Sequence, residues 1–283
     1  MTVASIITTL SVVLLCLVVA SVDCFVVVKT SRSTLPLALS PQQLGTFESL
    51  LIEEDTKTRT VQLFDWSGCD PISFQEGWDF QKDLLSHHLD RLKEDDDRKQ
   101  FDGFDSIVML QHTPVYTLGT GSDPDFVLSD TVEVIRMDRG GEVTYHGPGQ
   151  LVVYPVIDLR GYKQDIHWYM RALEETILLA LQKAGIENAV REDDVTGVWI
   201  GQRKVAAFGI KARRWITQHG IAINVTPESL ANFEGIVPCG LEGRKVTCVN
   251  DHLSQPISVE IFAEFVKEAL EEVFCIQLME AEP

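Results

Sequence analysis

Apolar residues recur at helical spacing in three stretches of the chain. The clearest stretch covers residues 74–92, where tryptophan and leucine side chains return every three to four positions. Residues 166–184, with a mixed surface, and residues 258–274 are the other two candidates. We therefore expect a helix over each of these three ranges.

Shorter apolar or alternating runs predict strands. These runs cover residues 60–66, 107–110, 132–137, 151–159, 196–200, 204–210 and 218–225. A Gly-Gln turn joins the strands at 196–200 and 204–210, residues 111–121 are turn-rich, and the acidic residues 94–97 are typical of a solvated loop. Because the strands follow one another with few long helices between them, the pattern favours an α+β fold. We expect mixed, mainly antiparallel sheets with flanking helices.

The first 47 residues differ in composition from the rest. Residues 6–20 form an apolar stretch shorter than a membrane span and typical of a signal-peptide core. Residues 24–47 contain no Asp or Glu, and their Ser, Thr, Lys and Arg are typical of a transit peptide. We expect a plastid leader over residues 1–47, with a mitochondrial leader or a signal anchor as alternatives. Residues 48–283 should form one domain with no stable membrane association once the leader is removed.

Composition excludes several classes of protein. A formal charge of −18 argues against nucleic-acid binding, because phosphate contacts need clustered Lys and Arg. The hydrophobic fraction of 45% is that of a globular protein with a core of its own. Six cysteines are scattered without a C-x-x-C pair, which argues against a structural zinc site and a disulfide framework.

The most distinctive segment covers residues 139–150, with the sequence RGGEVTYHGPGQ. Four glycines and a proline exclude a helix or a plain strand. The interleaved polar side chains suggest a loop that approaches a ligand closely. The glycine spacing matches neither the dinucleotide motif nor the phosphate-binding loop.

Two later segments complete a pattern. Residues 201–215 (GQRKVAAFGIKARRW) lead into residues 217–224 (TQHGIAIN), and residues 236–240 read IVPCG. Together with the glycine run, they resemble the lipoate-protein transferase family, the octanoyl-[acyl carrier protein]:protein octanoyltransferases. The resemblance covers residues 61–274 and implies the fold of the biotin and lipoate protein ligases, with residues 48–283 as the catalytic domain.

Cys239 and Lys204 are the candidate catalytic residues. Cys239 lies before Gly240, whose backbone N–H can face a developing oxyanion. Lys204 begins an apolar strand, where partial desolvation makes an amine a usable base. Taken alone, the cysteine could equally be a small buried hydrophobe and the lysine a solvated cation. Cys248, in the apolar run VTCV, is the competing thiol and is more typical of a core.

The resemblance assigns a reaction to these two residues. Cys239 would carry the octanoyl group as a thioester, and Lys204 would activate the thiol. The donor would be octanoyl-acyl carrier protein. The acceptor would be a lysine of a lipoyl domain from a 2-oxoacid dehydrogenase complex, or of the glycine cleavage H protein. This transfer, the first step of protein lipoylation, needs no cofactor or metal.

The resemblance also implies a substrate pocket. Its residues would be Arg139, Gly140, Gly141, Glu142, Val143, Thr144, Tyr145, His146, Ala207, Phe208, Gly209, Gly220, Ile221 and Ala222. For Arg139, bracing of the loop is as good an interpretation as contact with the ligand. For His146, a structural hydrogen-bonded role is the alternative. Arg213 and Arg214 are expected to face the carrier protein.

Three other functions are compatible with parts of the sequence. An ATP-dependent lipoate or octanoate ligase would share the RGG motif but would not need Cys239. A non-catalytic scaffold that binds carrier proteins would need neither Cys239 nor Lys204. A cysteine hydrolase would need a histidine partner, for which His219 is the best candidate.

Overall fold

The computed structural model describes residues 59–94, 105–193, 195–237 and 244–281, all within one compact unit, Gln42–Pro283. The leader predicted over residues 1–47 therefore lies outside the described residues. Within the described ranges, no helix is both long and apolar enough to cross a membrane.

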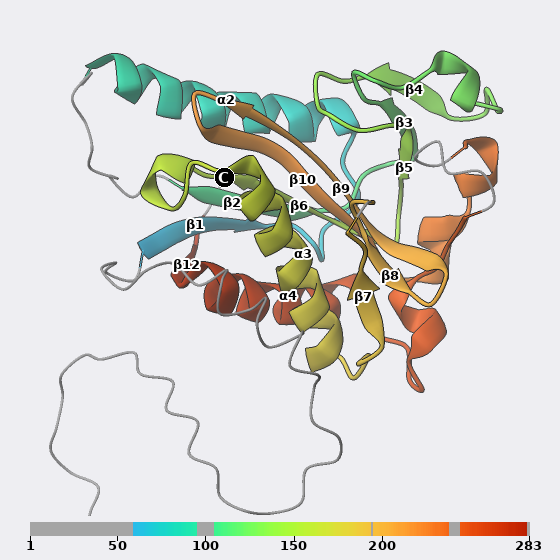
Figure 1. The fold of residues 1–283 in the computed structure, drawn as a ribbon. Helices are drawn as coiled ribbons and strands as arrows, with labels where there is room; N and C mark the ends of the chain where they lie inside the picture. Colours follow the sequence, from blue (N-terminus) through green and yellow to red (C-terminus); the bar gives the residue numbers. More distant parts are fainter. Residues whose placement is uncertain (1–58, 95–104, 194, 238–243, 282–283) are drawn as a thin grey trace, which may run out of the picture. The chain divides into compact units, whose positions relative to one another are not determined.

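A nine-stranded sheet forms the centre of the fold (Figure 1). In spatial order it contains β12 (Ile276–Glu280), β1 (Arg59–Asp65), β2 (Ser106–Leu110), β6 (Gln150–Val156), β10 (Ile216–Asn224), β9 (Arg203–Arg213), β8 (Val198–Ile200) and β7 (Ala189–Arg191), and β11 (Lys245–Val246) pairs with β9. The ladder is antiparallel from β2 through β7, while β12–β1, β1–β2 and β9–β11 are parallel. The predicted α+β class with mainly antiparallel pairing is confirmed.

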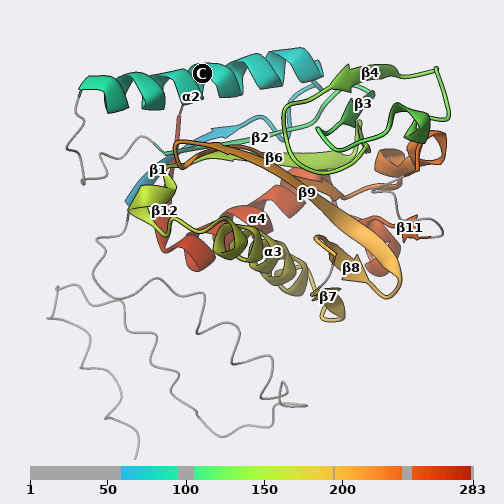
Figure 2. The ribbon, with the colours of Figure 1, turned by 45° about the horizontal axis from the view of Figure 1, so that its top comes forward.

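Helices cover both faces of this sheet (Figure 2). α3 (Ile166–Lys183) and α4 (Val259–Phe274) pack on one face and form the largest hydrophobic core with it. α2 (Phe74–Glu94) packs on the other face. All three predicted helices are confirmed within two residues at each end.

The starts of the helices follow from local capping. The side chain of Asp165 accepts from the Trp168 backbone N–H at the start of α3, and Ser258 accepts from Ile261 at the start of α4. At the start of α2, Ser73 and Glu76 exchange hydrogen bonds as a capping box.

A smaller sheet lies beside the central one and has the order β4 (Glu133–Arg136), β3 (Val115–Leu118) and β5 (Thr144–His146). Among the described residues, five short 3-10 helices accompany the sheets: η1 (Pro124–Phe126), η2 (Leu159–Gly161), η3 (Pro227–Leu230), η4 (Phe233–Gly235) and η6 (Val249–His252).

Two sequence predictions are corrected by the smaller sheet. Residues 111–121, predicted as turns, contain the fully buried strand β3. The glycine run, predicted not to be a strand, contains β5, which pairs with β3. A strand of three or four residues is too short to show a period, so only its pairing reveals it. Of the predicted loop at residues 94–97, Glu94 ends α2 and the rest lies outside the described residues.

Candidate active site

A pocket opens on the α2 side of the central sheet, with about 480 Å³ of empty space that includes solvent at its mouth. Strands β6, β9 and β10 line it, together with the segment around residues 139–146 and Phe74 of α2. The predicted substrate-binding residues on its wall are Arg139, Glu142, Val143, Thr144, His146, Ala207, Phe208, Gly209, Gly220, Ile221 and Ala222. Gly140, Gly141 and Tyr145, predicted with them, are not among the lining residues.

Small residues form the floor of the pocket. Across the β9–β10 ladder, Ala207 pairs with Ala222 and Gly209 pairs with Gly220. Side chains alternate between the two faces of a strand, so Phe208, between Ala207 and Gly209, packs against the core on the α3–α4 side. The pocket thus has room because its face of the hairpin carries nothing larger than a methyl group at these four positions.

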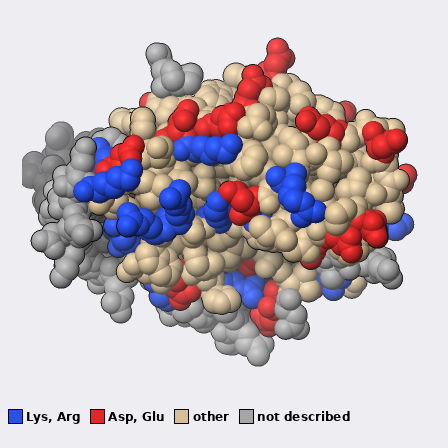
Figure 3. Space-filling model, turned by 90° about the horizontal axis from the view of Figure 1, so that it is seen from above, with Lys and Arg blue, Asp and Glu red and all other residues tan. Residues whose placement is uncertain are grey.

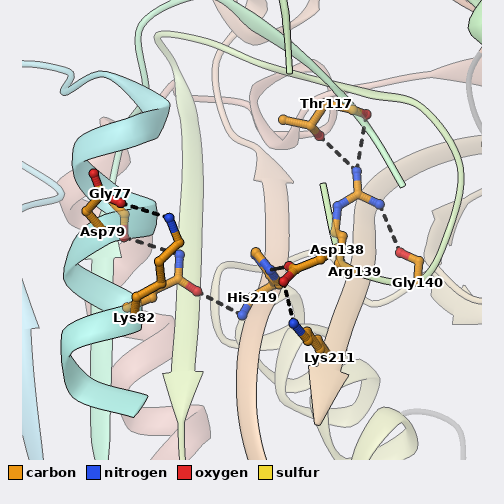
Figure 4. Close-up of polar contacts among 10 residues, drawn as sticks. Gly77, Asp79, Lys82, Thr117, Asp138, Arg139, Gly140, Lys211 and His219 are labelled. Atoms are coloured by element: carbon orange, nitrogen blue, oxygen red, sulfur yellow. Dashed lines mark hydrogen bonds and ion pairs between the residues drawn. The ribbon is translucent and has the colours of Figure 1, made fainter. Parts of the chain in front are cut away.

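Arg139 lies across this floor and is only 7% exposed. Its guanidinium donates to the carbonyl oxygens of Gly140 (3.0 Å) and Thr117 (3.3 Å) and to Thr117 Oγ1 (2.8 Å) (Figure 4). It also donates to the carbonyl oxygen of Glu142 at 3.2 Å. A Cβ on Gly209 would lie 2.9 Å from Arg139 Cδ, so this close approach requires glycine. Arg139 therefore both braces the glycine run against β3 and contributes to the pocket wall.

The three residues of β5 divide between two environments. Thr144 and His146 line the pocket, whereas Tyr145 packs with the smaller sheet and its hydroxyl accepts from Asn232 Nδ2 at 3.0 Å. Gln150 Nε2 donates to Tyr145 O, which leaves Gln150 Oε1 to accept from His146 Nδ1 at 2.7 Å. The prediction that Tyr145 lines the pocket is thus replaced by a packing role behind it, because alternate side chains on a strand point to opposite faces.

Three buried imidazoles and one phenol gather around the pocket. His112 Nδ1 donates to Ile72 O at 3.2 Å, and His112 Nε2 accepts from the Tyr154 hydroxyl at 2.8 Å. Burial lowers the pKa of His112 to about 4, of His146 to about 3 and of His219 to about 4. Burial also raises the pKa of Tyr154. All four rings are therefore uncharged at neutral pH, as suits a site for an apolar chain.

Lys204 lies in a second, smaller cavity of about 290 Å³ that shares Thr144, Ala207 and Ala222 with the first. The lysine is 7% exposed. Its Nζ donates to Thr196 O at 3.3 Å and lies 4.8 Å from the centre of the Trp199 ring. The structure thus joins the predicted lysine to the predicted acyl pocket through common wall residues.

Cys239 and Gly240 lie outside the described residues, but the chain on either side of them is fixed. Before them, the Val237 backbone N–H donates to Phe126 O at 2.9 Å. After them, Val246 pairs with Lys204 in a parallel bridge and lines the same cavity. The described chain after them, Lys245–Val246, therefore runs beside Arg203 and Lys204.

The competing thiol is part of the core. Cys248 is fully buried and caps the short helix η6, and burial raises the pKa of its thiol to about 11. A protonated, enclosed thiol is a poor nucleophile. The prediction that Cys248 is a core residue is confirmed.

Four residues that line the pocket were not among the predicted substrate-binding residues: Phe74, Val152, Tyr154 and His219. Tyr154 lies in the YP motif that follows the glycine run, which was an available signal. His219 was singled out only as a hydrolase partner. It pairs with Ile210, six residues along β9 from Lys204 and so about 20 Å away at the usual strand rise. Among the described residues, no group of His, Cys, Asp or Glu side chains could hold a metal ion.

The fold matches that of lipoate protein ligases. The bi-partite lipoate protein ligase of Thermoplasma acidophilum superposes with a TM-score of 0.59 over 80% of this chain and 87% of that chain, at 16% identity. At that identity the likeness shows the class of fold. The α+β architecture is therefore that of a lipoate protein ligase catalytic domain.

Sequence comparison identifies the family more closely. The family model described as "Lipoyl protein ligase A/B catalytic domain" matches residues 74–271. A chloroplastic octanoyltransferase of Arabidopsis thaliana is 44% identical over 198 residues, 69% of this chain and 68% of the relative. An octanoyltransferase of Gloeobacter violaceus is 44% identical over 208 residues, 73% of this chain and 88% of the relative. The chain belongs to the lipoyl protein ligase A/B catalytic domain family and, within it, to the octanoyltransferases.

Proposed function

We propose that this chain moves an octanoyl group from acyl carrier protein to a lysine of a lipoyl domain through a thioester on Cys239. The observation that carries the proposal is the buried amine of Lys204, whose cavity shares three wall residues with the pocket. An acyl chain in the pocket has its carbonyl end toward the cavity that holds this amine. The pairing of Val246, seven residues after Cys239, with Lys204 supports the same arrangement.

The proposed reaction has two steps: a thioester exchange, and then the attack of an amine on the new thioester. Lys204 Nζ takes the proton of the Cys239 thiol as the sulfur attacks the carbonyl carbon of the octanoyl thioester. The bond to the carrier's sulfur breaks, and that sulfur leaves with the proton from Lys204. The acceptor's ε-amine then attacks the Cys239 thioester, an amide forms, and Lys204 returns the amine's proton to the cysteine sulfur.

Burial of the acyl chain supplies binding energy to this reaction. An octanoyl chain has about six methylenes, each worth about 0.8 kcal/mol if fully desolvated, so the pocket can contribute up to about 5 kcal/mol. The apolar floor and the uncharged imidazoles of the wall provide the surface on which this energy depends.

Charge is compatible with docking of an acidic carrier despite the net charge of −18. Lys and Arg gather in a band across the face that carries α2 (Figure 3). Arg213 and Arg214, at the β9–β10 turn, are exposed, and within the described ranges neither forms an ion pair. Since long-range repulsion is screened within about 10 Å in physiological salt, we infer that this local basic turn contacts the carrier.

The test is a search for the acyl-enzyme by mass spectrometry after incubation with octanoyl-acyl carrier protein, without ATP. The wild type should gain the mass of one octanoyl group on Cys239, and Cys239→Ser should not transfer the group to a lipoyl domain. The matched control Cys248→Ser should form the adduct normally. A requirement for ATP would support a ligase instead, and release of free octanoate would support a hydrolase. An unmodified protein with no turnover would support a scaffold.

We further propose that the protein works in the plastid, delivered by residues 1–47. The composition of that segment supports this, and the Arabidopsis relative is a chloroplastic protein. A fluorescent fusion of the first 60 residues should enter plastids; entry into mitochondria would overturn the assignment.

A further inference from the structure

The side chain of His219 lies on the opposite face of the sheet from the one its position in β10 predicts. Thr217, Ile221 and Ile223 face the α3–α4 layer: both isoleucines belong to that core, and Thr217 Oγ1 lies 3.5 Å from the Tyr169 hydroxyl. Strict alternation would place His219 with them. Instead, it lines the pocket on the α2 side.

The backbone at His219 explains this reversal. Its φ is +58°, a left-handed conformation that is unfavourable for a residue with a Cβ. Its N–H donates to Gln81 Oε1 of α2 at 2.8 Å. The ring centre lies 6.4 Å from the ring centres of both Trp78 and Tyr154. A conformation of this kind persists only where several contacts hold it.

A second set of contacts fixes the far edge of the imidazole ring (Figure 4). His219 Nε2 donates to Asp138 Oδ1 at 3.3 Å, and the other oxygen of Asp138 pairs with Lys211 Nζ. The imidazole is 3% exposed, whereas the Asp138 side chain is 49% exposed. The imidazole therefore separates the pocket from an ion pair that lies at the surface.

The distance from the Lys204 cavity to this ring matches the length of the acyl chain. Ala222 belongs to both cavities, and His219 is three residues further along β10, about 10 Å at the usual strand rise. An extended chain advances about 1.2 Å per bond, so the seven carbon–carbon bonds of octanoyl span about 8 Å. A decanoyl chain would reach about 11 Å and would meet the ring.

We propose that His219, held by Gln81 and Asp138, is the end wall of the acyl pocket and selects octanoyl over longer acyl chains. The inference rests on the proposed function, because it takes the carbonyl of the substrate to lie at Ala222, where the pocket meets the Lys204 cavity. Gln81, Asp138 and Lys211 act as positioning residues, since they hold the imidazole without contacting the acyl chain.

The experiment measures kcat/KM with hexanoyl-, octanoyl-, decanoyl- and dodecanoyl-acyl carrier protein and a lipoyl domain as acceptor. His219→Gly removes the imidazole and suits the left-handed backbone. Asp138→Ala leaves the ring in place but removes its anchor. Asp130→Ala, which removes an exposed acid from the same stretch of the chain, is the matched control.

The wild type should prefer octanoyl. His219→Gly should raise the decanoyl-to-octanoyl ratio up to about fifteenfold, since each of the two newly buried methylenes is worth about fourfold. Asp138→Ala should raise the ratio less, and Asp130→Ala should leave it unchanged. If His219→Gly fails to fold, as judged by circular dichroism, Asp138→Ala decides the matter.

Two results would overturn the inference while leaving octanoyl transfer intact. One is a wild type that transfers dodecanoyl as well as octanoyl. The other is an unchanged ratio in folded His219→Gly or, if that variant does not fold, in Asp138→Ala. A wild type that transfers no acyl group of any length would instead overturn the proposed function, and the inference with it.

Discussion

The buried histidines make the free energy of unfolding depend on pH between pH 7 and pH 5. Most carboxylates titrate at lower pH. We expect the free energy of unfolding to fall by about 3 kcal/mol between pH 7 and pH 5. The folded-state pKa values of His112, His146 and His219 are lowered by burial to about 4, 3 and 4, whereas an unfolded histidine has a pKa near 6.5. The unfolded chain therefore binds more protons below pH 6.5, and stability falls as the pH falls towards the folded-state values.

The size of this fall follows from the difference between the folded-state and unfolded-state pKa values. Each histidine lowers the free energy of unfolding by about 2 kcal/mol between pH 7 and pH 5, so the three together lower it by about 5 to 6 kcal/mol. Asp105 acts in the opposite direction, because complete burial raises its pKa to about 8. Between pH 8 and about 3.9 the Asp105 carboxyl is protonated in the folded state but ionised in the unfolded chain. Acidification from pH 7 to pH 5 therefore raises the free energy of unfolding by about 2.7 kcal/mol through this group. The net loss is about 3 kcal/mol, a large part of a typical total stability.

Urea unfolding at pH 7, 6 and 5, followed by tryptophan fluorescence, measures this loss directly. Asp105→Asn is the informative control, because the amide can still accept from the Asp158 N–H and pair with the Tyr162 hydroxyl. The substitution removes the titration of Asp105, so the fall in the free energy of unfolding between pH 7 and pH 5 should grow to about 5 kcal/mol. A wild-type stability that is flat or rising towards pH 5, or an Asp105→Asn slope equal to the wild type, would refute the reasoning.

Three further substitutions test the site. Arg139→Leu removes a buried donor of four hydrogen bonds and should lower the free energy of unfolding in urea by about 3 to 5 kcal/mol; a change under about 1 kcal/mol would contradict its bracing role. Gly197 has a φ of +150°, and a Cβ there would lie 3.0 Å from Lys204 Cε, so Gly197→Ala should lower kcat for octanoyl transfer at least about tenfold by displacing the base. An unchanged kcat would remove Lys204 from the mechanism. Reversing the charges of Arg213 and Arg214 should raise KM for octanoyl-acyl carrier protein without changing turnover of a small octanoyl thioester; equal losses on both substrates would exclude a docking role.

The sequence predicts the three helices and most strands of the central sheet, and it misses strands whose pairing no local pattern shows. The three helices have enough turns to display an apolar face, and strands such as β6 and β10 are long enough to show continuous burial. Strand β12 follows α4 directly and finds its partner at β1, more than two hundred residues earlier. Such pairing depends on contacts that no local period encodes.

The glycine run and the apolar strand led to Arg139, which lines the pocket, and to Lys204, which lines the adjoining cavity. His219 shows the limit of that reasoning. Its motif was visible, but alternation along β10 predicts the wrong face for it, and only its left-handed φ and the tie to Gln81 turn it into the pocket. Tyr145 shows the opposite error. Its place in the glycine run suggested contact with the pocket, but alternate side chains of β5 face opposite ways, and Tyr145 faces away from the pocket.

The β9–β10 hairpin gives its two faces different functions, so its register is as important as its composition. Ala206 and Phe208 pack against the α3–α4 core, while Ala207 and Gly209 leave the pocket open on the other face. A slip of one residue would exchange the faces and fill the pocket with Phe208. Close contacts oppose that slip, because a Cβ on Gly220 would lie 2.2 Å from the carbonyl oxygen of Val153. The glycines of this hairpin therefore fix the register and, through it, keep large side chains out of the pocket.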